Sequence, residues 1–277
     1  MWQLLVAALF LSGLCCFTPA AVAQPIATVR SDSSAQLAQE MLEAGSVRAQ
    51  GQRLAKLYRQ VGLDVQARQA NVALTAGLAQ GEQSLRRLSR YTQLPAAARA
   101  YGRCLTVWQE FRAVVGEPYS TGGAERAGQL AEELAIPAGK LALQIEAAAE
   151  SPAGRALDGA ARLNMFAQRL ARLYFQSLAG DRSQGLITDL AQTRSEFASG
   201  LLELERMPLN GQQAREALVL VRNQWIFLDE AVRQATMRQG GGRDAQHVAT
   251  SSERIQETLS GLAAQYREVL QAGLRAQ

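Results

Sequence analysis

The chain has few cysteines and histidines, the residues that form disulfides and that bind zinc. Its 277 residues include three cysteines and one histidine, His247. Cys15 and Cys16 lie in an apolar N-terminal segment, which leaves Cys104 alone in the remainder. A lone cysteine cannot build an intrachain disulfide framework, and one histidine without a cysteine cluster cannot assemble a zinc site. We therefore expect no metal site, and a fold stabilised by burial, with Cys104 as a small buried apolar residue.

Recognisable catalytic motifs are also missing. The sequence has no glycine-rich phosphate loop, no Gly-x-Ser-x-Gly, and no histidine placed to act with a serine. It also lacks the Glu-x-x-His pairs that bridge metals in helical bundles. We therefore expect no catalytic residues, no cofactor and no enzymatic activity.

Long apolar runs are confined to the N-terminus. Residues 4–10 and 11–17 are apolar, and a small-residue site (Ala-Val-Ala, 21–23) precedes Gln24. This pattern predicts a secretory signal peptide over residues 1–23, and hence a periplasmic protein. The alternative is an uncleaved N-terminal membrane anchor, although the run is shorter than the roughly 20 residues that span a bilayer. After residue 23 we expect no membrane span.

Lysine is almost absent. The net charge of +4 comes from 27 arginines and only two lysines, Lys56 and Lys140. A basic surface can bind nucleic acid or anionic lipid. Here the arginines are dispersed and often lie within four residues of an acid, and export removes nucleic acid from consideration. We expect no nucleic-acid partner and only a mild preference for anions.

Helix formers dominate what is present. Alanine, leucine, glutamine, arginine and glutamate are abundant, and no alternating strand pattern persists. Turn residues separate eight predicted helices, at 33–61, 64–91, 95–115, 124–150, 155–179, 183–206, 209–239 and 243–275. Four helices with short connections pack as an up-down bundle. The predicted fold is all-α, with two tandem up-down four-helix bundles over 33–150 and 155–275.

Local signals define the expected helix ends. A residue within 31–33 suits the N-cap of the first helix, and Asp64 that of the second. Pro95 is expected to open the third helix, because proline is tolerated in the first turn. Pro137 removes a backbone donor inside the fourth helix and should kink or split it.

One segment occurs twice. Residues 44–58 read AGSVRAQGQRLAKLY, and residues 160–174 read AARLNMFAQRLARLY. Equivalent positions are 116 apart, while Trp108 and Trp225, in apolar helical patterns further on, are 117 apart. This pattern predicts an internal duplication of one helical unit, with the two tryptophans as core anchors.

A helical wheel separates two stripes in the first copy. The stripe expected to face the core consists of Ala44, Val47, Gly51, Leu54 and Tyr58. Gly45, Arg48, Gln52 and Arg59 form a second stripe on the flank, and Arg53 points in a third direction. A guanidinium fork with an amide one turn away suits a small planar anion. Two alternatives stay open: Arg48 pairs with an acid of a neighbouring helix, or it extends to water.

Residues 44–54 resemble the periplasmic ligand-binding box of nitrate/nitrite-sensor histidine kinases. Both copies also resemble the repeated motif in the N-terminal sensory domain of type IV pili methyl-accepting chemotaxis transducers (the PilJ type), the second copy most closely over residues 164–171. The resemblance implies a periplasmic four-helix sensory bundle that works as a homodimer. It also implies that Arg48 binds nitrate or nitrite at the dimer interface, beside Gly45.

The predicted ligand-binding residues are Gly45, Arg48, Gln52 and Arg53, with second-copy equivalents Asn164, Gln168 and Arg169. Asn164 stands where the first copy has Arg48, so anion recognition is expected in the first copy. Members of the two families signal through a transmembrane helix, whereas we expect no membrane span after residue 23 of this chain. We therefore expect a soluble periplasmic binding protein that acts through an inner-membrane receptor. The alternative is a helical interaction module without a ligand, which docks its first and fifth helices on a receptor or on another copy of itself.

Overall fold

The structure is a computed structural model, and it describes residues 26–149, 151–236 and 242–276. In this part of the chain there are α-helices, one short 3₁₀ helix and no strand, so the all-α prediction is confirmed. The elements are α1 (Ile26–Gly62), α2 (Ala67–Arg87), η1 (Ser89–Gln93), α3 (Pro95–Gly116), α4 (Thr121–Ala149), α5 (Pro152–Leu178), α6 (Gln184–Glu205), α7 (Gln212–Thr236) and α8 (Gly242–Ala276). The predicted signal peptide lies outside the described residues.

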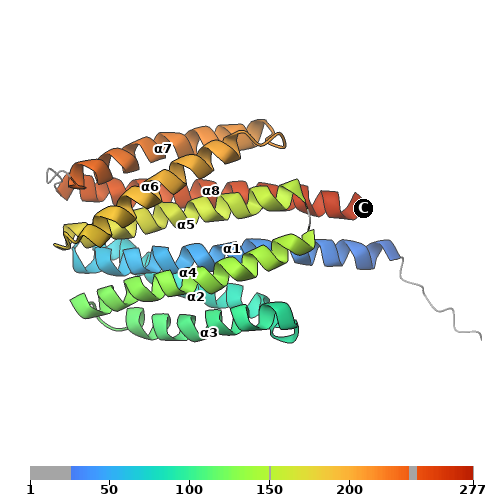
Figure 1. Cartoon of the computed structure of the whole chain (residues 1–277), viewed down its shortest axis with the longest axis horizontal. Helices are drawn as coiled ribbons and strands as arrows, with labels where there is room; N and C mark the ends of the chain where they lie inside the picture. The colour runs from blue at the N-terminus through green and yellow to red at the C-terminus, as the bar shows by residue number, and fades with distance from the viewer. Residues whose placement is uncertain (1–25, 150, 237–241, 277) are drawn as a thin grey trace, which may run out of the picture.

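The helices run alongside one another in two stacked groups, with α1–α4 forming one and α5–α8 the other (Figure 1). In the first group α1 packs against α2 and α4, and α3 packs against α4. In the second, α5 packs against α6 and α8, and α7 packs against α8. The most extensive contact between any two helices joins the groups, because α1 lies along α5. Buried side chains of both groups form one continuous hydrophobic core.

Buried positions recur between the groups at constant offsets. The offset is 116 residues between α2 and α6, as for Leu74 and Leu190, and 117 between α3 and α7, as for Phe111 and Leu228. Between α4 and α8 it is 121. The offset changes only in the connections between helices, where added residues do not alter which face of a helix is buried. Each helix of one group therefore presents the same buried face as its counterpart.

Both tryptophans are buried, as predicted, but their surroundings differ. A Cβ atom on Gly81 of α2 would overlap the indole of Trp108. Glycine is therefore needed at this position for the ring to lie against the α2 backbone. The equivalent residue of α6 is Phe197, whose ring stacks on Trp225 with centroids 4.3 Å apart. The two groups thus fill the same space with different pairs of side chains.

Two predicted helix starts are wrong. Helix α1 begins at Ile26, so residues 31–33 lie inside it rather than at its N-cap. Helix α2 begins at Ala67, and its N-cap residue is Gln66 without a side-chain hydrogen bond. Asp64 and Gln66 have φ angles of 55° and 51°. The chain turns through these left-handed residues, which leaves Asp64 too far from the first turn of α2 to cap it.

Pro137 does not split the fourth helix, which is continuous over Thr121–Ala149. The proline removes one backbone hydrogen bond. Burial on both sides of it offsets that loss, because Leu134, Ala138 and Leu141 all lie in the core. None of the helices that the structure describes is both long and apolar enough to cross a membrane.

Candidate ligand-binding site

The two copies of the repeated motif meet at Gly45 and Ala161, which are equivalent positions of α1 and α5. A Cβ atom built on Gly45 would lie 2.5 Å from the Cβ atom of Ala161. The two helices approach this closely only because position 45 is a glycine. We call this contact between α1 and α5 the seam. The helix faces that the resemblance assigns to a dimer interface therefore contact each other within one chain.

Arg48 is buried beside the seam, on the flank where α1 meets α5. Its Nη2 atom donates to Oδ1 of Asp158 in α5 over 2.9 Å, and the two side chains are 8% and 9% exposed. Helix α5 covers that flank of α1 and supplies the opposite charge, which the helical wheel of α1 by itself does not show. Of the alternatives for this arginine, pairing with an acid of a neighbouring helix is the one observed.

Gln52 and Gln168 are equivalent and fully buried. Oε1 of Gln52 accepts a hydrogen bond from Nε of Arg172 at 2.8 Å. Nε2 of Gln168 donates to the carbonyl oxygen of Ser252 at 2.8 Å. The Gln52 amide thus joins α1 of the first group to α5 of the second, whereas the Gln168 amide joins α5 to α8 within the second group. Neither glutamine lines the two cavities described below.

Arg53 pairs with an acid of the other helix group. Glu253 of α8 accepts from Nη2 of Arg53 at 2.5 Å and from Nζ of Lys56 at 2.6 Å. Burial lowers the pKa of Lys56, although the attraction of Glu253 opposes this shift. Burial also acts to raise the pKa of Glu253, but Lys56 and Arg53 outweigh it and hold this pKa at about 2. Glu253 is therefore ionised at neutral pH.

The second copy repeats this arrangement with α4. Glu132 accepts from Nε of Arg169 at 2.8 Å and also from Arg172, the equivalent of Lys56. The two acids correspond to each other as well, because α4 and α8 are related by the offset of 121 residues. In each copy, basic residues of the motif bind an acid on the last helix of the other group. These pairings hold the groups together.

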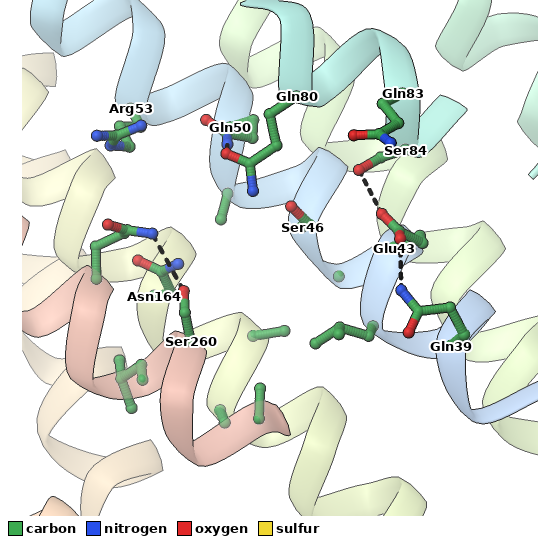
Figure 2. A pocket seen from close by; sticks show the side chains of 18 of the residues that line it. Gln39, Glu43, Ser46, Gln50, Arg53, Gln80, Gln83, Ser84, Asn164 and Ser260 are labelled. Carbon is green, nitrogen blue, oxygen red and sulfur yellow. Dashed lines mark hydrogen bonds between the residues drawn. The ribbon is translucent and has the colours of Figure 1, made fainter. Parts of the chain in front are cut away.

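A cavity of about 260 Å³ opens beside the seam, between α1, α2, α5 and α8 (Figure 2). Of the predicted site residues, Gly45, Arg53 and Asn164 line it, and the other four do not. Asn164 is the α5 equivalent of Arg48. Leu42 also lines the cavity, and it is the α1 equivalent of Asp158. The Arg48–Asp158 ion pair therefore has no counterpart on this side of the seam. The Oδ1 atom of Asn164 is buried without a hydrogen-bond partner.

Charged groups in the cavity wall are already paired. Glu43 of α1 accepts from Nη1 of Arg87 at 2.5 Å, from Oγ of Ser84 at 2.5 Å and from Nε2 of Gln39 at 2.6 Å. Arg53 pairs with Glu253, as described above. The remaining polar lining consists of amides and hydroxyls: Ser46, Gln50, Gln80, Gln83, Asn164, Gln256 and Ser260.

A second cavity, of about 240 Å³, lies across the seam between α4, α5 and α6. Its lining repeats several positions of the first cavity at the offset of 116, with Asp158 in place of Leu42 and Arg162 in place of Ser46. Burial and the nearby Asp158 raise the pKa of Glu146 in its wall. This cavity is lined by charges of both signs, and none of the buried unpartnered atoms belongs to its lining.

Sequence reasoning missed the acids that pair with the motif. Asp158 could have been found by aligning the two copies. The second copy gains an acid at this position, where the first copy has Leu42, and it lacks the arginine that the first copy has at position 48. Glu253 and Glu132 gave no such signal, because they lie on helices far along the chain from their partners. The sequence also did not identify Glu43 and Gln50 as cavity-lining residues. The helical wheel of α1 does not show where the neighbouring helices leave a cavity.

The remaining chemistry-bearing residues have structural surroundings. Cys104 is fully buried in α3, as predicted. The hydroxyl of Tyr58 donates to the carbonyl oxygen of Pro118 at 2.9 Å, whereas that of Tyr174 is buried without a partner. His247 is exposed on α8. No group of three or more histidine, cysteine, aspartate or glutamate side chains within the described residues could hold a metal ion.

A scan against protein-family models finds no match, and searches of curated proteins and of solved structures find none either.

Proposed function

We propose that this chain is a sensory or ligand-binding helical protein that is exported to the periplasm and acts through a partner receptor. The observation that carries the proposal is the cavity beside the seam, whose wall is built from both helix groups. A ligand held there contacts α1 and α2 of one group and α5 and α8 of the other. Binding can then favour one placement of the groups over another, which is what a sensor requires.

The resemblance of the duplicated motif to sensory domains supports this proposal. In the nitrate sensors the anion lies at the dimer interface, and here the equivalent faces of α1 and α5 meet within one chain. The internal pairing takes the place of a homodimer interface at this position. A single chain then contains both halves of the sensory unit, and a receptor in the inner membrane is the proposed partner.

Nitrate and nitrite are candidate ligands because of the resemblance. An anion at Arg48 has to compete with the carboxylate of Asp158, which already binds the guanidinium at 2.9 Å. The cavity on the other side of the seam has Leu42 in place of Asp158, and its lining includes amides and hydroxyls that can hold a small polar molecule. We therefore place the ligand site in the cavity lined by Gly45, Arg53 and Asn164.

The test combines binding with a distance measurement. Spin labels at Gln109 of α3 and Asn223 of α7, in a background without the native cysteines, report the separation of the two groups. Small anions and small neutral polar molecules are added to the labelled protein, and its melting temperature and label distance are recorded. A ligand that raises the melting temperature and changes the distance supports a sensor. If no compound does either, the proposal is wrong.

The second candidate function is an interaction module without a small ligand, and α7 favours it. Four apolar side chains on its outer face, Val219, Leu220, Ile226 and Phe227, are each 56–59% exposed. The equivalent residues of α3 are Gly102, Arg103, Gln109 and Glu110. The outer face of this helix is therefore polar in one group and apolar in the other, although both serve the same bundle position. Such an exposed apolar face is typical of an interaction site.

This candidate predicts that α7, and not the seam, contacts a partner. The double variant Ile226→Gln/Phe227→Glu restores the residue types of α3. We expect it to fold normally, because both side chains are mostly exposed, and to abolish any cross-linked complex formed in periplasmic extracts. The matched control exchanges Gln109→Glu and Glu110→Gln on α3. Loss of the complex in both variants, or in neither, contradicts this candidate.

A further inference from the structure

We propose that the cavity between α1, α2, α5 and α8 binds a small uncharged polyhydroxylated molecule, such as a polyol or a monosaccharide, rather than an anion. This inference rests on the proposed ligand-binding function and specifies its ligand class. The charge of the cavity, its unpartnered atoms and its two unlike walls favour such a ligand.

The charge of the cavity favours a neutral ligand. The charged side chains in its wall are in ion pairs: Glu43 pairs with Arg87, and Arg53 pairs with Glu253. A charged ligand would have to replace one of these contacts and leave a partly buried ion without its partner, which is costly. A neutral ligand leaves both ion pairs intact.

The unpartnered atoms are hydrogen-bond acceptors. Two residues of the lining have a buried side-chain oxygen without a partner: Gln50 through Oε1 and Asn164 through Oδ1. The other end of the Gln50 amide is fixed, because its Nε2 atom donates to Oε1 of Gln80 at 2.8 Å. Buried acceptors without partners cost stability. Nitrate has no N–H or O–H group and cannot satisfy them, whereas a hydroxyl donates to one group and accepts from another.

The two walls of the cavity differ, which suits a molecule with both hydroxyl groups and a carbon face. Polar side chains from α1 and α2 gather on one side, including Ser46, Gln50 and Gln80 (Figure 2). On the α5 and α8 side, Asn164 and Ser260 stand among small apolar residues. These apolar residues are Ala160, Ala161, Leu259 and Ala263. Amides can bind the hydroxyls while the alanines and the leucine contact the C–H groups.

The opposite cavity provides an internal comparison. It has a similar volume, about 240 Å³, but its lining contains charged residues of both signs, including Arg155 and Glu203, and no side-chain amide. It contributes no buried unpartnered acceptor in the described part of the chain. The duplication therefore yields two spaces of similar size, and only the one next to Asn164 has the chemistry for a hydroxyl-bearing ligand.

The experiment titrates the purified protein with glycerol, erythritol, ribose and glucose, and separately with sodium nitrate and sodium acetate at constant ionic strength. Binding is detected by saturation-transfer NMR, and each Kd is taken from a chemical-shift titration. Asn164→Leu removes one acceptor, and Ser260→Leu narrows the space without changing a buried residue. The matched control is Asn223→Leu on the exposed face of α7. Circular dichroism and melting temperatures verify that each variant folds.

We expect at least one polyhydroxylated probe to bind, with a Kd about tenfold weaker in Asn164→Leu and in Ser260→Leu, and unchanged in Asn223→Leu. If only nitrate or acetate binds, the ligand class is wrong although the ligand-binding function stands. If a polyol binds equally well to all variants, the site is wrong. If none of the probes binds and no other compound shifts the melting temperature, the ligand-binding function itself fails.

Discussion

Asp158 of α5 neutralises Arg48 of α1 across the seam, through a 2.9 Å ion pair between two buried side chains. The arginine that the resemblance assigns to anion binding is thus occupied by a carboxylate of the same chain. Asp158 has the position in its copy that Leu42 has in the other. This acid gives Arg48 a structural role that a comparison of the motif alone does not reveal.

Removing this carboxylate should expose the anion site. Asp158→Asn leaves the guanidinium of Arg48 buried without its counter-charge, which we expect to lower the free energy of unfolding by about 3–5 kcal/mol. Nitrate should restore part of this loss by taking the place of the carboxylate. The measurement is the melting temperature in sodium nitrate and in sodium fluoride at equal ionic strength.

Two controls make this prediction specific. The wild type should gain less from nitrate than Asp158→Asn does, because Asp158 competes with it. In the double variant Asp158→Asn/Arg48→Met, the nitrate effect should disappear. An equal response of all three proteins would show that nitrate acts elsewhere.

The close approach of α1 and α5 predicts a compensating pair of substitutions. Gly45→Ala should destabilise the protein by about 1–3 kcal/mol, because the new Cβ would lie 2.5 Å from that of Ala161 and the helices must separate. Alanine's better helix propensity recovers up to about 1 kcal/mol of this. Adding Ala161→Gly should restore most of the loss by exchanging the two residue types.

Urea unfolding of the two single variants and the double variant measures this coupling. A double variant as unstable as the sum of its parents would mean that the two positions are not in contact.

The ion pairs of Glu253 predict a pH dependence. Its pKa in the folded protein is about 2, below the ordinary value of 4.5, because Lys56 and Arg53 outweigh the effect of burial. A lowered carboxyl pKa stabilises the folded state fully above pH 4.5, and this contribution is lost as the pH falls towards 2. At pH 7, Glu253→Gln should cost about 2 kcal/mol. This is less than for a fully buried pair, because a third of the side chain is exposed to water.

Urea midpoints at pH 7, 4 and 2.5 test this prediction. The difference between wild type and Glu253→Gln should shrink as the pH falls through this range. Glu257→Gln, at an exposed position of the same helix, controls for introducing a glutamine. A difference that stays constant with pH would contradict the role of the carboxylate charge.

The thiol of Cys104 should be inert in the folded protein. It is fully buried, and burial raises its pKa to about 12. Since the thiolate is the reactive form, a disulfide reagent at pH 8 should label this residue only as fast as the protein opens, and urea should accelerate the labelling. A Cys104→Ala variant identifies any signal from Cys15 or Cys16. Rapid labelling of Cys104 without denaturant would contradict its burial.

The sequence alone predicted which parts of the chain are helical and that several apolar side chains are buried. Abundant helix formers and the turn residues between them predicted the helices, the burial of Trp108 and Trp225 followed from their apolar neighbours, and that of Cys104 from its being a lone cysteine. Helix formation and the burial of one face depend on residues three or four positions apart. These signals are local, so a single sequence contains them.

Tertiary structure decided how the repeated motif is used. Whether Arg48 faces water, an anion or an acid depends on which helix covers it, and that helix begins about a hundred residues further on. The pairing of Arg53 with Glu253 spans 200 positions. The cavity beside Asn164 exists because four helices leave a space between them that none of them determines by itself. Local periodicity fixes the faces of the helices, but only their packing together decides which charges meet and where a ligand could enter.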